Sequence, residues 1–122
     1  MKNKSKRISK TLKIPLYVGR LTIIITENLT SLIKEYPALK EDFLKRHGAV
    51  TFWEGTNIYS AFELRQLTPG LIAHEAKHVT NRVFINIGHY LDLENDEPEC
   101  YLLSWVVNRI TDAHNDLLKK DE

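Results

Sequence analysis

One predicted helix, over residues 68–88, constrains this chain more than any other part of its sequence. Thr68 and Pro69 are typical of an N-cap followed by proline in the first helical turn, and Gly88 is typical of a helix end. Apolar residues recur between these signals at helical spacing, which predicts one face packed on a core. These apolar positions are Leu71, Ile72, Ala76, Val79, Val83 and Ile87.

The same helix carries the segment His74-Glu75-Ala76-Lys77-His78. Residues four apart lie one turn apart on the same helix face, so the imidazoles of His74 and His78 can bind a single Zn²⁺ ion. Glu75 follows one of these histidines directly and is placed to accept a proton from a metal-bound water. The alternative is an ordinary core helix in which two histidines happen to have this spacing.

The composition is typical of one globular domain. The chain has 122 residues, of which 43% are hydrophobic and 27% charged, and its formal net charge is +1. This charge provides no strong field that would attract nucleic acid or a membrane surface. No apolar run reaches the length of a membrane span, no signal-peptide core follows the basic N-terminus, and the single Cys100 excludes an intrachain disulfide. We therefore expect a cytoplasmic protein.

The charge pattern divides the chain into a basic arm, one domain and a short tail. Residues 1–11 are rich in lysine and poor in apolar side chains, which predicts a flexible arm. Because no aromatic residue is interleaved with these charges, the arm does not favour nucleic-acid binding. We expect residues 12–118 to form the domain and residues 119–122 a tail, with fraying from Asp112 onward.

Two hairpins are predicted before the histidine helix. The first hairpin is predicted over Leu12–Tyr17 and Leu21–Thr26. Because Pro15 lacks a backbone hydrogen-bond donor, the earlier segment should be an edge strand. The later segment is rich in β-branched residues and should be central. Residues 49–53 and 58–64 read as the second hairpin, across a Gly-containing turn. Because the histidine helix follows almost at once, strand 58–64 should lie beside the functional cleft and offer an edge to a peptide.

The remaining segments are predicted to be helical. Residues 27–36 read as a helix with Thr26 as N-cap, and residues 39–47 as a second helical piece that ends at Gly48. After the loop over residues 89–95, Asp96 can cap a strongly apolar last helix. The sequence thus predicts an α+β fold with a small mixed or antiparallel sheet and helices packed on one face.

A catalytic zinc usually has three protein ligands and one open position, so a third ligand is needed. Glu97 lies 19 residues after His78 at a helix start, where it would be presented rigidly, and we favour it. Glu99 lies on the apolar side of the same helix, where a carboxylate needs a partner. His89 lies in the preceding loop. Both remain alternatives.

The segments Leu71–Val79 and Asn95–Val106 together resemble the small zinc metallopeptidases that bacteriophages and prophages encode. Those proteins pair His-Glu-x-x-His with a later helix that opens on a glutamate and continues through a Tyr-Leu-x-x-Trp segment. They are similar in outline to gluzincins, the group that contains thermolysin. The resemblance covers about residues 58–110, and its most specific part is Asp-Glu-Pro followed by Tyr-Leu-Leu-Ser-Trp.

This resemblance implies a zincin-like fold and zinc-dependent hydrolysis of a peptide or protein substrate. It implies that His74, His78 and Glu97 bind Zn²⁺ and that Glu75 is the catalytic base. A shorter segment, Phe52–Tyr59, is similar to the aromatic edge strand that pairs with substrate in thermolysin-like enzymes.

The chain departs from larger gluzincins at Tyr101, where they carry an aspartate that orients a zinc-binding histidine. Asp96, Asp92 or Tyr101 itself would have to give that support. Tyr90, Tyr101 and His114 are the candidates for donors to the transition state. We expect Cys100 to be a small buried core residue, and Trp105 to pack near the cleft.

Two functions therefore follow from the sequence. The first is a zinc-dependent peptidase. The second is a zinc-stabilised module that binds a protein through the same cleft and edge strand without cleaving it. The presence of Glu75 favours the peptidase, because a purely structural site needs no base.

Overall fold

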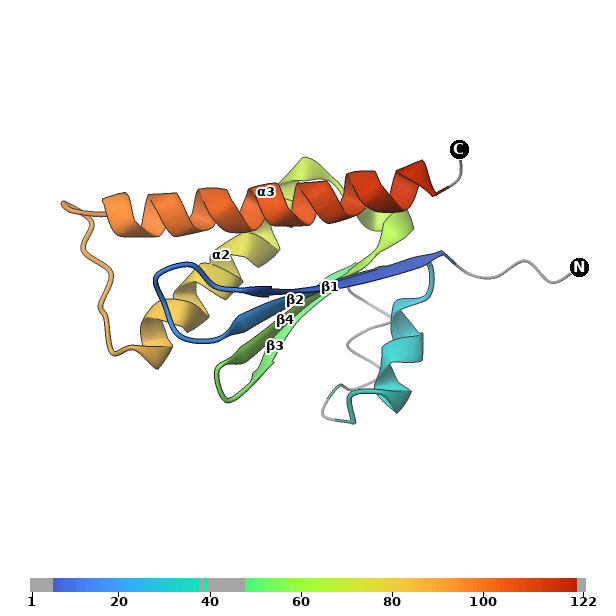
Figure 1. Ribbon diagram of the computed structural model, residues 1–122, viewed down its shortest axis with the longest axis horizontal. Helices are drawn as coiled ribbons and strands as arrows, with labels where there is room; N and C mark the ends of the chain where they lie inside the picture. Colours follow the sequence, from blue (N-terminus) through green and yellow to red (C-terminus); the bar gives the residue numbers. More distant parts are fainter. Residues whose placement is uncertain (1–5, 38, 40–47, 121–122) are drawn as a thin grey trace, which may run out of the picture.

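Four strands form one open mixed sheet in the order β1-β2-β4-β3 (Figure 1). The structure is a computed structural model that describes residues 6–37, 39 and 48–120. Antiparallel pairing joins β1 to β2 and β3 to β4, while β2 and β4 run parallel at the centre. The strands are β1 (Arg7–Lys13), β2 (Arg20–Thr26), β3 (Ala49–Glu54) and β4 (Asn57–Glu63).

Two long helices, α2 (Pro69–Asn86) and α3 (Glu97–Lys119), cover one face of this sheet, as Figure 1 shows. The short 3₁₀ helix η1 (Leu29–Lys34) lies on the other face. A second 3₁₀ turn, η2 (Leu64–Gln66), leads from β4 into α2. The α+β class, the small mixed sheet and the helices packed on one face are as the sequence predicts.

The central strand β2 is buried on both faces because apolar layers cover it on each side. Ile23 and Ile25 pack in the main core with α2 and α3, whereas Ile24 packs with Leu29 and Leu32 of η1. Successive side chains of a strand point to opposite faces, so a strand with both faces covered is apolar throughout. The uninterrupted run Ile23-Ile24-Ile25 reflects this position.

The first strand begins earlier than the sequence predicts. Residues 7–11, which the sequence assigns to the flexible arm, are paired with residues 22–26 of β2. Only Ile8 and Leu12 bring apolar side chains to the core from β1, and the other positions are polar because β1 is an edge strand. Because several of these polar positions are basic, the composition of the segment does not indicate a strand. Pro15 lies after β1, in the loop that leads to β2.

The prediction that strand 58–64 offers an edge to a peptide is wrong. The strand with a free edge beside α2 is β3. β4 is hydrogen-bonded to β2 on one side and to β3 on the other, so its backbone groups are already paired. A peptide can add only to a strand with a free edge. The hairpin itself is confirmed, with Gly55 at φ +62° in the turn.

The helix predicted over residues 27–36 is the shorter 3₁₀ helix η1, with Asn28 rather than Thr26 at its N-cap position. The helical piece predicted over residues 39–47 lies outside the described residues, apart from Leu39. The arm over residues 1–5 also lies outside them.

The ends of the two long helices have clear physical causes. The Thr68 hydroxyl accepts a hydrogen bond from the Leu71 amide at 3.1 Å, so the predicted N-cap of α2 is confirmed. Gly88 follows the helix at φ +71°, which favours glycine. The predicted fraying from Asp112 is wrong, because Ala113 and Leu117 are buried and extend the apolar face of α3.

In the described part of the chain, neither α2 nor α3 nor any shorter helix combines the length and the apolar character needed to cross a bilayer.

Candidate metal centre

The two histidines lie on the exposed face of α2, one turn apart. Their Nε2 atoms are 3.2 Å from each other. Two nitrogen ligands at about 2.0–2.1 Å from a tetrahedral Zn²⁺ ion are separated by roughly 3.3–3.4 Å. The observed distance is close to the spacing that one shared zinc ion requires, and it is also a distance at which one imidazole can donate a hydrogen bond to the other. The helix itself produces this arrangement, because residues four apart lie on the same face one turn apart.

Glu75 lies beside this pair and is buried, with only 4% of its surface exposed. Its Oε2 atom is 3.7 Å from Nε2 of His74, and its Oε1 atom accepts a hydrogen bond of 2.7 Å from the Thr51 hydroxyl. One ligand atom from each of His74, Glu75 and His78 can be chosen so that all lie within 4.8 Å of one another. A buried carboxylate is costly without a donor, and Thr51 supplies one.

A cavity of about 530 Å³ opens in front of the histidines, between the edge strand β3 and α2. Because successive residues of a strand alternate between its faces, Ala49, Thr51 and Trp53 all face α2. The cavity is lined by these residues and by Val50, His74, Glu75, His78, Asn81, Arg82 and Ile85. The structure thus places a candidate metal site along the free edge of the sheet.

Two of the residues that line the cavity form a cation–π pair. The guanidinium carbon of Arg82 lies 3.7 Å from the centre of the Trp53 ring, which is a cation–π contact. Thr51, Trp53 and Arg82 were not among the predicted site residues. The spacing could have identified Arg82, since it continues the series of His74 and His78 by four residues. Nothing local in the sequence shows that β3 is the strand beside α2.

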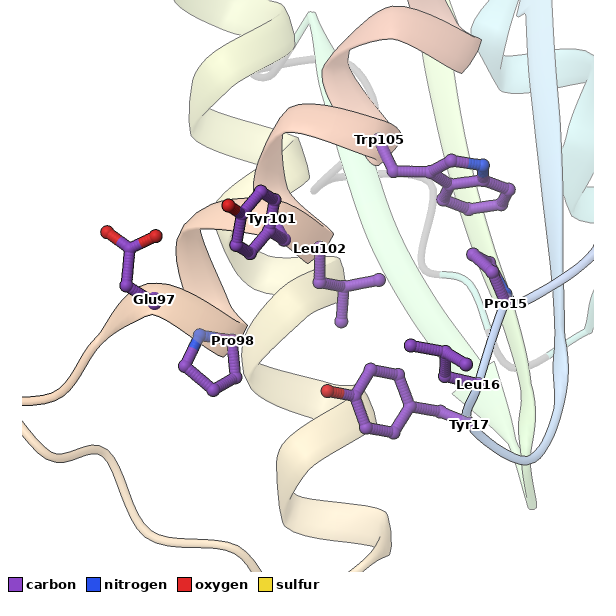
Figure 2. Close-up of a pocket in the computed structure, with 8 residues that line it drawn as sticks. All are labelled: Pro15, Leu16, Tyr17, Glu97, Pro98, Tyr101, Leu102 and Trp105. Atoms are coloured by element: carbon purple, nitrogen blue, oxygen red, sulfur yellow. The ribbon is translucent and has the colours of Figure 1, made fainter.

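Glu97, the favoured third ligand, does not join the histidines. It is exposed at the first residue of α3 and lies outside the group formed by His74, Glu75 and His78. Figure 2 shows it at the margin of a different, apolar cavity of about 380 Å³. That cavity is also lined by Pro15, Leu16, Tyr17, Pro98, Tyr101, Leu102 and Trp105. The physical reason is that α3 packs over β1 and β2, whereas the histidines face β3.

The two alternatives for the third ligand also lie elsewhere. Glu99 is buried with its Oε2 atom 3.7 Å from Nζ of Lys77, which supplies the partner that a buried carboxylate needs. The exposed ring of His89 packs on Phe84 with 4.9 Å between ring centres. Over residues 6–37, 39 and 48–120, neither residue belongs to the convergent group.

The predicted supporting residues do not line the histidine cavity either. Tyr90 is exposed in the loop before α3, and Tyr101 lines the apolar cavity of Figure 2. His114 lines a third cavity with Leu67 and Pro69. Asp96 occupies the N-cap position of α3 but makes no side-chain capping hydrogen bond. The other candidate is Asp92, whose carboxylate accepts a hydrogen bond of 3.0 Å from the backbone amide of Glu94.

Cys100 is exposed, so the prediction of a buried core residue is wrong. It faces outward on the first turns of α3, where the apolar side of the helix is carried by Leu102 and Val106 instead. Local desolvation and the neighbouring carboxylates of Asp96 and Glu97 raise the pKa of its thiol. A thiol with a raised pKa is a poor metal ligand at neutral pH, because the thiolate is the form that binds.

Comparisons with protein-family models, with curated proteins and with solved structures found no match for this chain. The chemistry of the site therefore rests on the geometry of His74, Glu75 and His78.

Proposed function

We propose that this chain is a zinc-dependent peptidase whose site is built from His74, His78 and Glu75. The single observation that carries the proposal is the convergence of two imidazole nitrogens, 3.2 Å apart, with a buried carboxylate beside them. This convergence occurs in a cavity that runs along the free edge of the sheet. Zinc, hydrolase activity and the part of the resemblance to phage-encoded gluzincin-like enzymes that His74, Glu75 and His78 carry belong to this proposal, whereas Glu97 does not.

In the proposed reaction, His74 and His78 would hold Zn²⁺, which would supply a Lewis acid for the peptide carbonyl and lower the pKa of a bound water to about 7. Glu75 accepts the proton of the attacking water and returns it to the leaving amine. Thr51 holds the Glu75 carboxylate through the 2.7 Å hydrogen bond, so the base needs little reorganisation. The Thr51 hydroxyl on β3 therefore positions the Glu75 carboxylate on α2.

The substrate would be an extended peptide that adds to β3. The ladder of β3 pairs with β4 on one side, and within the described residues no other strand pairs with its outer side. Backbone pairing at a free edge gives affinity without demanding a particular sequence, and the cavity side chains then select among peptides. We propose a peptide or protein substrate, a cytoplasmic location, and no membrane or nucleic-acid partner.

A second candidate is a zinc-stabilised module that binds protein without cleaving it. It is favoured by one observation, which is that Glu75 lies within the convergent group while Glu97 lies outside it. If Glu75 bound the metal itself as third ligand, the site would have no free base. Such a site would be structural.

Replacement of Glu75 by glutamine separates these two functions. For a peptidase in which Glu75 is the base, E75Q retains zinc and loses turnover on a peptide library. For a module in which Glu75 is a ligand, E75Q loses zinc affinity and the parent protein cleaves no peptide. Zinc content and cleavage measured together on both proteins distinguish the outcomes, with H74A as the control for metal loss.

A further inference from the structure

Arg82 extends the face of α2 that carries the histidines. It lies four residues after His78, and all three side chains of the series His74, His78 and Arg82 line the same cavity. Four residues of helix correspond to about 6 Å along its axis. A cationic side chain therefore leaves the helix about 6 Å beyond His78 along the axis and lines the same cavity.

The guanidinium of Arg82 is oriented but not neutralised. Its guanidinium carbon lies 3.7 Å from the centre of the Trp53 ring, a cation–π contact that holds the group over the face of the indole. In the part of the chain that the structure describes, its Nε has no hydrogen-bond partner and no carboxylate pairs with the group. The cavity contains one carboxylate, on Glu75, and the hydroxyl of Thr51 already holds that group.

Asn81 adds a second donor on the same side of the cavity. Its Oδ1 atom accepts a hydrogen bond of 2.9 Å from Nζ of Lys77. This contact turns the acceptor end of the amide toward Lys77, so its nitrogen is the end left for a ligand. Two donors, one of them cationic and planar, suit a carboxylate, which accepts two parallel hydrogen bonds.

We propose that Arg82, with Asn81, forms a carboxylate subsite that selects acidic peptides. The inference rests on the proposed peptidase function and names its substrate class. An extended peptide advances about 3.3 Å per residue, so the offset of about 6 Å between the helix positions of His78 and Arg82 corresponds to one or two residues of a peptide that runs along the cavity. The carboxylate is that of an aspartate or glutamate side chain, or the free C-terminus of a short peptide.

The test compares matched peptides on the zinc-loaded full chain. Each peptide carries either glutamate or glutamine one or two residues from a central bond, and each is made with a free or an amidated C-terminus. We expect the parent protein to favour the carboxylate form by about tenfold or more in kcat/KM, the range of a hydrogen bond to a charged group. A preference lost on amidation identifies the C-terminus, and one lost with glutamine identifies the side chain.

Variants assign this preference to Arg82. R82Q should abolish it while neutral peptides are still cleaved, and R82K should restore only part of it, because lysine lacks the planar pair of donors. R65Q removes one positive charge from an exposed position outside the cavity and should change nothing. Cleavage without any carboxylate preference in the parent, or a preference that survives in R82Q, would overturn the subsite and leave the peptidase intact.

If the parent protein cleaves no peptide, the proposed function fails. The affinity of the protein for the same matched peptides then tests the carboxylate subsite. In a W105F background, Trp53 is the only tryptophan and reports on the cavity. Tighter binding of the glutamate or free-acid peptide, lost in R82Q, supports the subsite. Equal binding of the acidic and neutral peptides overturns it.

Discussion

The hydroxyl of Thr51 on β3 donates a 2.7 Å hydrogen bond to the Glu75 carboxylate on α2. This contact joins the edge strand to the helix that carries both histidines. Because Glu75 is buried, its polar atoms need hydrogen-bond donors from the protein. The position of β3 and the placement of the candidate base are therefore coupled through one hydroxyl group.

Removal of this hydroxyl should destabilise the protein. T51V keeps the shape of the side chain but leaves the buried Glu75 carboxylate without its donor, so we expect a loss of about 1–3 kcal/mol in the free energy of unfolding. Chemical denaturation of the metal-free protein measures the change. T51S is the matched control and should be close to the parent protein, because it retains the hydroxyl. Equal stability of T51V and T51S would show that the contact does not stabilise the fold.

Zinc should stabilise the folded chain through the histidine pair. A ligand that binds only the folded state at 100 times its Kd adds about 2.7 kcal/mol to the free energy of unfolding. We expect zinc to raise the melting temperature of the parent protein and EDTA to reverse the effect. H74A and H78A should lose this response, whereas H89A should retain it, because the ring of His89 packs on Phe84 outside the site. A full zinc response in H78A would exclude the proposed pair.

The resemblance and the structure lead to different expectations for Glu97. The resemblance implies that it binds zinc, whereas the structure places it at the margin of the apolar cavity in Figure 2. From the structure we expect E97A to leave zinc affinity unchanged, as measured by competition with a chelator. E99Q serves as the companion variant on the same helix. A loss of about tenfold or more in E97A, the size seen even for residues that only support a ligand, would show that α3 approaches the metal.

An ion pair between β1 and the end of η1 should give an acid-dependent contribution to stability. Arg7 donates hydrogen bonds of 2.6 and 2.8 Å to the two carboxylate oxygens of Glu35. These bonds hold the pKa of Glu35 below its ordinary value of 4.5. A carboxylate with a lowered folded-state pKa stabilises the fold above the unfolded-state pKa, and this contribution is lost as the pH falls through the folded-state pKa.

We therefore expect E35Q to cost up to about 1 kcal/mol at neutral pH, since the pair is largely exposed to solvent. The cost should vanish in acid well below the unfolded-state pKa. Urea denaturation over this pH range measures it, and E54Q, at the exposed tip of the second hairpin, is the control. A cost independent of pH would mean that Glu35 acts through packing rather than charge.

The sequence predicts α2 well because its determinants are local. Thr68, Pro69 and Gly88 define its ends, and the spacing of His74 and His78 follows from helical geometry alone. The first strand is harder to predict, because an edge strand with a solvated face resembles a basic arm in composition. The class of the fold follows from the alternation of predicted strands and helices.

Sheet order and helix packing are not local, and most of the differences arise there. The pattern of residues 58–64 predicts a strand but does not indicate that it pairs on both sides. Thr51 reaches Glu75 because β3 lies against α2 in the folded chain. In the same way, the distance from Glu97 to the histidines depends on which strands α3 covers, and no spacing along the chain specifies this.

The E75Q variant tests the central claim most directly. Zinc affinity and peptide cleavage are measured together for the parent protein and E75Q. Glutamine has nearly the same shape as glutamate but cannot act as a base. If Glu75 is the base of a zinc peptidase, E75Q binds zinc like the parent and cleaves about 10²–10⁴-fold more slowly. Cleavage by E75Q at the parental rate, or a loss of zinc in E75Q together with an inactive parent protein, would contradict this account.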